Sequence, residues 1–195
     1  MSLTLIASTF GVIFVAELPD KTALASLLLA TRYRARVVIA GAWLAFAVHT
    51  AIAVAAGSVL HLLPARPVHI AAGVGFLVFA VLAFRRREGE ELAEQQVAVG
   101  AQAKRQLPGW LVTFLVVFAA EWGDLTQLAM AALVARTGQP LSVAAGAIAA
   151  LWTVTVIAAV TGAQMSRLLS PIVLTRASGV LFAVIGVAVL AAALI

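Results

Sequence analysis

Residues 17–22 read ELPDKT and lie in the middle of a long apolar segment. Residues 121–127 read EWGDLTQ and interrupt a second apolar segment in the same way. An acidic side chain at the centre of a membrane helix costs about 2.5–3.5 kcal/mol, so acids kept at that depth require a reason. These two segments therefore decide both the fold and the function that the sequence predicts.

The composition is that of a polytopic helical membrane protein. Of the 195 residues, 64% are hydrophobic and 11% are charged, whereas soluble domains have about 45–50% and about 25%. The chain has no cysteine, which excludes disulfides and thiolate metal sites. Basic residues flanking the apolar runs explain the net charge of +5, so nucleic acid is not an expected partner. No basic region precedes the first apolar run, so we expect no cleaved signal peptide.

Polar breaks divide the chain into six apolar spans, each close to or above the roughly 20 residues that a membrane helix needs. The predicted spans are 3–31, 37–61, 67–85, 108–135, 140–166 and 171–194. Ten basic residues lie in the connections on one side, whereas only Arg66 and Arg136 lie on the other. Because the side richer in Lys and Arg is cytoplasmic, both termini are expected outside.

The second half of the chain repeats the first. Glu17 and Glu121 are 104 positions apart, as are Asp20 and Asp124, and glycines in the following helices match with small shifts. Three helices per repeat make the halves antiparallel, which is the inverted-repeat plan of secondary transporters. The predicted fold is thus an all-α membrane protein with six transmembrane helices as a 3+3 inverted repeat. Its predicted parts are a first repeat at 1–85, a cytoplasmic charged linker at 86–107 and a second repeat at 108–195.

The linker at 86–107 carries four of the eight acidic residues. Its charge pattern favours a solvated linker or a short amphipathic helix. A regulatory or cation-collecting role is the alternative.

The other four acids are candidate ligands for a divalent cation. A Glu and an Asp three residues apart lie on one face of a helix, so two such faces can place four carboxylates around one cavity. Oxygen ligands suit hard cations such as calcium, magnesium and manganese. The candidate metal ligands are the acids Glu17, Asp20, Glu121 and Asp124, with neutral oxygens from Thr22, Thr126 and Gln127.

Pro19 and Gly123 are expected to break their helices at this depth. Proline lacks an N–H donor, which frees the carbonyl of Val15. Gly123 loosens the fourth span and is expected to expose the carbonyl of Ala119. Broken helices are tolerated at midplane where they line a cavity, and their carbonyls can coordinate ions.

Clustered carboxylates repel one another, so such a group can hold a proton when the cation is absent and release it when the cation binds. This is the physical basis for cation/proton exchange at one site. Lys21 is a candidate for charge balance. His49, near the centre of the second span, either takes part in proton coupling or hydrogen-bonds a neighbouring helix. A purely structural role, in which the acids pair with Lys21, is disfavoured because one lysine cannot balance four carboxylates.

The two motifs resemble those of the GDT-type cation/proton exchangers, a family related to MneA-like manganese exporters and to Golgi and chloroplast manganese/calcium transporters. Its pattern is Glu-x-Gly-Asp-(Lys/Arg)-(Ser/Thr), once in each three-helix half. The resemblance implies export of manganese, or next calcium, in exchange for protons, with the motif acids as the cation site and no cofactor. It also implies a multi-pass protein of the bacterial cytoplasmic membrane. Pro19 departs from the usual Gly, and Leu125 from the usual Lys or Arg.

Two other functions are weighed against this one. A six-helix exporter of a small organic cation or amino acid would have a larger cavity lined by aromatics. An intramembrane lipid-processing enzyme would need a nucleophile or an Arg/His cluster near the headgroups, and neither motif contains a Ser-His pair. Membrane lipids are the expected surroundings, and the oligomeric state is left open, with a homodimer as one option.

Overall fold

The computed structural model describes residues 1–17, 25, 28–30, 32–85, 90–103, 107–168 and 171–194. This part of the chain is built from helices joined by short turns, as the composition predicts. The helices whose bounds fall within these residues are α1 (Leu3–Glu17), α3 (Ala35–Leu60), α4 (Ala65–Arg85), α5 (Glu90–Ala103), α6 (Gly109–Ala120), α7 (Leu125–Thr137), α8 (Pro140–Leu168) and α9 (Pro171–Leu194).

Four predicted spans agree with single helices to within a few residues, namely those that became α3, α4, α8 and α9. Two segments of the described chain are long and apolar enough to cross a membrane, Ala35–Leu60 and Pro140–Val160. Shorter apolar helices run over Leu3–Glu17, Arg66–Leu82, Gly109–Ala120 and Phe182–Ala193. The fourth predicted span, 108–135, is two helices, α6 and α7. The first predicted span, 3–31, contains α1, and most of its residues after Glu17 lie outside the described residues.

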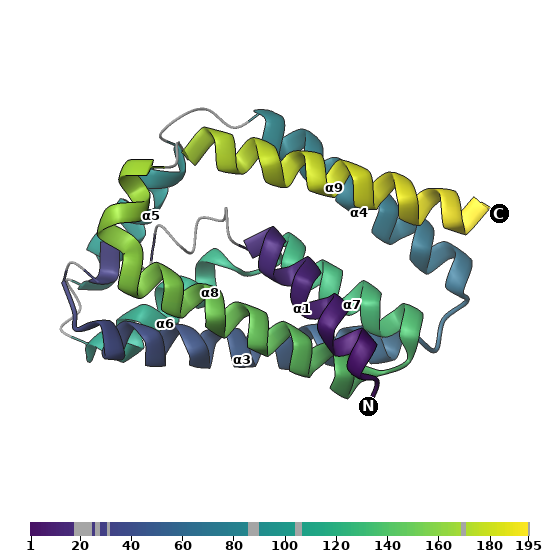
Figure 1. Cartoon of the computed structure of the whole chain (residues 1–195), viewed down its shortest axis with the longest axis horizontal. Coiled ribbons are helices and arrows are strands. Elements are labelled where there is room, and N and C mark those ends of the chain that lie inside the picture. The colour runs from purple at the N-terminus through teal and green to yellow at the C-terminus, as the bar shows by residue number, and fades with distance from the viewer. Residues whose placement is uncertain are drawn as a thin grey trace.

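The helices form two groups (Figure 1). α4 and α9 lie side by side, and α1, α3, α6, α7 and α8 form the other group. Phe76 of α4 and Phe182 of α9 stack with ring centroids 6.3 Å apart. A Cβ added to Gly73 would lie 2.6 Å from Leu190 Cγ, so glycine is needed for this close approach of α4 and α9.

Two helix contacts use residues that the sequence repeat pairs. Gly41 of α3 packs on Thr113 of α6, and Gly146 of α8 packs on Thr9 of α1. A Cβ on the first glycine would lie 2.7 Å from the threonine Cβ, and one on the second 2.9 Å. The glycines are 105 positions apart and the threonines 104. Small residues at such crossings let membrane helices approach closely, and here the halves do so at equivalent points.

Gly146→Ala is expected to destabilise the protein, because its methyl group would also lie 2.5 Å from the carbonyl oxygen of Ile6. Overpacking of this kind costs about 1–3 kcal/mol. Gly11→Ala on α1 is the matched control, since a Cβ there meets nothing within 4 Å. Thermal unfolding of the purified variants checks the expectation. Equal midpoints for the two variants would show that the contact between α8 and α1 is not tight.

α3 and α8 meet through a pair of tryptophans. The rings of Trp43 and Trp152 stack at 4.5 Å. Each indole N–H donates to the other residue's carbonyl oxygen, at 3.2 and 3.3 Å. The two central helices are thereby joined by hydrogen bonds as well as by packing.

Part of the predicted linker is the helix α5. Val99 on α5 is only 2% exposed and belongs to an apolar cluster with Val38, Val112 and Val116. Val97 on the same helix is 72% exposed. The described part of the linker is therefore amphipathic and packs on the helical bundle.

Candidate cation site

The fourth predicted span is broken at residues 121–124, between α6 and α7. The amide of Glu121 donates to the carbonyl of Val117 at 2.9 Å and closes the last turn of α6. Gly123 follows with φ +71°, a left-handed conformation that side-chain-bearing residues rarely adopt. The break that the sequence predicts at Gly123 is confirmed. The corresponding prediction, that Pro19 breaks the first span and frees the carbonyl of Val15, stays a prediction because Pro19 lies outside the described residues.

One sequence inference is wrong in its geometry. Glu121 and Asp124, three residues apart, were expected on one face of a helix. Instead Glu121 is the C-terminal cap of α6 and Asp124 is the N-terminal cap of α7. The left-handed Gly123 between them ends the helical repeat, so their spacing no longer follows helical geometry.

Asp124 holds the first turn of α7. Its Oδ1 accepts a hydrogen bond from the amide of Gln127 at 2.9 Å, and its Oδ2 accepts one from the hydroxyl of Thr126 at 2.7 Å. A carboxylate has about four lone-pair positions, so these two bonds leave acceptor capacity for a further ligand. The first turn of α7 thus fixes the position of the Asp124 carboxylate and leaves some of its lone pairs available to a cation.

The side chain of Gln127 in α7 hydrogen-bonds the backbone of the break at Gly123. Its Oε1 accepts from the amide of Gly123 at 2.8 Å. In a continuous helix that amide would bond the carbonyl of Ala119. The side chain of Gln127 therefore replaces a backbone acceptor at the break.

His49 bridges the two sides of the break from α3. Its Nε2 lies 3.0 Å from the carbonyl oxygen of Phe118 on α6, and its Nδ1 lies 3.3 Å from Nε2 of Gln127 on α7. Because a carbonyl can only accept, Nε2 carries the hydrogen and Nδ1 accepts from the Gln127 amide. Of the two alternatives that the sequence left open, hydrogen bonding to a neighbouring helix is present. A part in proton coupling stays a prediction.

Aromatic rings enclose this histidine. The His49 ring is 2% exposed and stacks on Phe118 with centroids 4.5 Å apart. Trp122 lies edge-on at 6.0 Å. The sequence did not predict that Phe118 and Trp122 contact His49. The signal was weak, since only their proximity to the second motif distinguished them from other apolar residues.

Three carboxylates from the two motifs converge. One oxygen from each of Glu17, Glu121 and Asp124 lies within 4.8 Å of the others. Glu17 is 1% exposed and Glu121 2%, and Asp124 is partly buried. Ligands on opposite sides of one calcium ion are about 4.6–5.2 Å apart, so these oxygens are close enough to share a single cation.

The remaining predicted site residues divide into two groups. Thr126 is buried beside Asp124, and Gln127 lies between Gly123 and His49. Asp20, Lys21 and Thr22 lie outside the described residues. Of the predicted acids, the described part of the chain therefore brings together one from the first motif and both from the second.

Comparison with known proteins adds independent findings. A family model described as "Divalent cation/proton antiporter GDT1" matches twice, at residues 5–91 and 109–195. A GDT1-like protein of Synechocystis sp. is 33% identical over 193 residues, which cover 92% of this chain and 93% of the relative. Protein PAM71, chloroplastic, of Arabidopsis thaliana is 35% identical over 201 residues, 91% of this chain and 54% of the relative. GDT1-like protein 2, chloroplastic, of Oryza sativa subsp. japonica is 32% identical over 93% of this chain and 59% of its own length. The chain thus spans little more than half of these chloroplast relatives, and no solved structure matches.

Proposed function

The chain belongs to the GDT1 family of divalent cation/proton antiporters, and from this premise we propose that it exports manganese, or next calcium, in exchange for protons. Membership makes it a transmembrane transport protein. The identity of the cation, the direction and the membrane are part of the proposal. We place the protein in a bacterial cytoplasmic membrane, as the resemblance to MneA-like exporters implies. The distribution of its basic residues favours both termini outside.

The observation that carries the proposal is the convergence of Glu17, Glu121 and Asp124 within 4.8 Å. We assign the cation to these carboxylates. Three oxygen ligands from two different motifs suit a hard divalent ion, which takes six or more oxygens in all. Further oxygens would come from Asp20, Thr22, Thr126 and Gln127 and from water. No resident cofactor is needed, because the cation is the cargo.

Proton exchange follows from the same cluster. Two ionised carboxylates about 4 Å apart repel by roughly 4 kcal/mol at an effective dielectric constant of about 20. Such repulsion favours a proton on the cluster when the cation is absent. An arriving cation removes the repulsion and displaces the proton, so the two ions compete for one site.

A six-helix inverted repeat would supply the two alternating states. The double match of the family model and the equivalent glycine contacts of α3 and α8 support this architecture. In it α6 and α7 together make one broken span, and residues 86–107 connect the repeats. Alternating access would rock the repeats about the shared carboxylates.

The two rival functions gain no support from this site. A bare ion fits three carboxylate oxygens within 4.8 Å better than an organic cation or amino acid does. For an intramembrane lipid-processing enzyme, the family model that matches offers no support, because it describes a divalent cation/proton antiporter.

The exchange reaction is testable in proteoliposomes. Manganese outside the vesicles is expected to enter while protons leave, with calcium slower and magnesium slowest. A fluorescent pH indicator inside the vesicles and a metal indicator report the two fluxes together. Protein-free vesicles are the control. Manganese flux without a change in internal pH would contradict the exchange mechanism, and equal rates for all three ions would contradict the proposed selectivity.

A further inference from the structure

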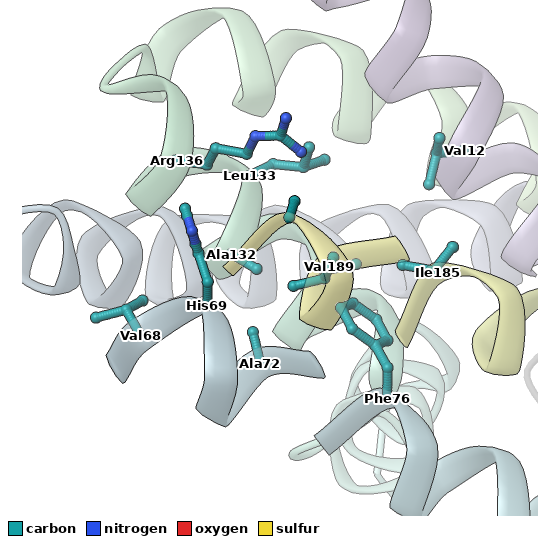
Figure 2. Close-up of a pocket in the computed structure, with 12 residues that line it drawn as sticks. Val12, Val68, His69, Ala72, Phe76, Ala132, Leu133, Arg136, Ile185 and Val189 are labelled. Carbon is teal, nitrogen blue, oxygen red and sulfur yellow. The ribbon is translucent and has the colours of Figure 1, made fainter. Parts of the chain in front are cut away.

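A cavity of about 260 Å³ lies between α1, α4, α7 and α9, apart from the carboxylates of the cation site (Figure 2). Its walls are almost entirely aliphatic and aromatic, with Phe76, Leu133 and Ile185 among them. It is larger than the engineered cavity of about 150 Å³ that binds benzene in a soluble protein. A space of this size and character suits a hydrocarbon ligand.

Arg136 gives the cavity a cationic end, and the His69 imidazole lies on the same side (Figure 2). Both side chains lie away from Phe76 and Ile185 (Figure 2). Arg136 is in the last turn of α7, and His69 is near the beginning of α4. Both are therefore at the ends of apolar helices, where the hydrocarbon layer gives way to the headgroups. The apolar part of the cavity extends from this level toward the middle of the bundle.

Among the described residues, no acidic side chain lines the cavity beside Arg136. All eight acidic residues lie in the two motifs and in the linker, at positions 17, 20, 88–94, 121 and 124. Asp124 is at the other end of α7, about 18 Å away at 1.5 Å per residue. The described lining of the cavity therefore gives Arg136 no counter-ion, and an anionic group of another molecule would neutralise it there.

A cation pathway is a poor explanation for this cavity. A divalent ion would lose its hydration against apolar walls and would meet a guanidinium at the entrance, and both effects are unfavourable. An anionic amphiphile satisfies both parts of the cavity at once. Its hydrocarbon fills the apolar space, and its phosphate meets the cationic end.

We propose that this cavity binds one acyl chain of an anionic phospholipid, whose phosphate contacts Arg136 and His69. The lipid holds α4 and α9 to α1 and α7 at the end of the bundle opposite the linker. The proposal does not depend on which cation is transported. It assigns the lipid to a defined site rather than to the general annulus around the protein.

Binding to the delipidated full-length protein in detergent tests this proposal. The probes are phosphatidylglycerol and phosphatidylcholine with identical acyl chains, and native mass spectrometry counts the bound lipids. Phosphatidylglycerol is expected to bind more tightly. Arg136→Gln is expected to weaken its binding about fivefold, the effect of one basic residue near an anionic surface, and to leave phosphatidylcholine unchanged.

Arg66→Gln is the matched control, since Arg66 lies on the same side of the membrane but does not line the cavity. It is expected to leave both affinities unchanged. Ala132→Leu should fill part of the apolar space and weaken both lipids. If that variant does not fold, Ala72→Leu on the facing helix α4 takes its place, with thermal unfolding confirming the fold.

Three results would overturn the proposal. Equal affinity for the two lipids would remove the role of the cationic end. Equal losses in Arg136→Gln and Arg66→Gln would indicate general surface charge. Displacement of phosphatidylglycerol by inorganic phosphate, with no effect of Ala132→Leu, would identify a free-anion site without an acyl chain.

Discussion

Glu17→Gln and Glu121→Gln are each expected to lower manganese/proton exchange about 100-fold or more. Each change removes one charged ligand from a cluster whose oxygens lie within 4.8 Å of one another. Losing one member of a buried charged contact costs about 2–5 kcal/mol, and 2.7 kcal/mol is a factor of about 100. Glutamine keeps the size and one oxygen of glutamate, so the loss measures the charge.

The matched control is Glu94→Gln in the polar linker, which removes the same charge from elsewhere in the chain. Its exchange rate is expected to stay near that of the unmodified protein. Initial rates in proteoliposomes with equal protein content give the comparison. Unfolding temperatures of the Glu17 and Glu121 variants are measured as well, so that a loss of exchange is separated from a loss of the fold. Undiminished exchange in either variant would remove that glutamate from the site.

The second large effect concerns Asp124, which has two functions that substitutions can separate. Its side chain caps α7 by accepting from Gln127 and Thr126, and its carboxylate belongs to the cluster with Glu17 and Glu121. Asn is as good an N-cap as Asp, whereas Ala costs about 1 kcal/mol. Asp124→Asn is therefore expected to lose exchange about 100-fold while remaining as stable as the parent.

Asp124→Ala is expected to lose exchange to the same degree and also to unfold at a lower temperature. The pair of variants is measured by exchange in proteoliposomes and by thermal unfolding in detergent. The combination of full exchange and low stability in Asp124→Ala would show that Asp124 is only a cap. Lower stability in both variants would show that the carboxylate oxygen that accepts from Thr126, which asparagine replaces with a donor, also holds the first turn of α7.

The sequence alone predicted that Glu17 and Glu121 approach each other, and this approach is confirmed. The reason was physical: acids are too costly at the centre of apolar segments unless they meet a partner or a ligand. The break at Gly123 was equally predictable, because glycine is the residue that tolerates a positive φ. The bounds of α3, α4, α8 and α9 followed from the polar breaks in the same direct way.

Other features depend on three-dimensional packing and could not be predicted from the sequence. The path from His49 through Gln127 to Gly123 joins residues 78 and 4 positions apart by side-chain hydrogen bonds, and no pattern in the sequence signals it. The positions of Glu121 and Asp124 as caps depended on where helix geometry ends rather than on their spacing. The cavity beside Arg136 arises where four helices fail to fill the space between them.

The break between α6 and α7 has an electrostatic consequence for transport. The carboxyl end of α6 and the amino end of α7 meet at Glu121 and Asp124. Aligned peptide dipoles give these ends about half a negative and half a positive elementary charge. The positive end of α7 stabilises the carboxylates when the cation has left, and the negative end of α6 stabilises the cation when it is bound. The broken helix therefore evens out the electrostatic energies of the loaded and unloaded protein, which favours a cycle in which neither state becomes a trap.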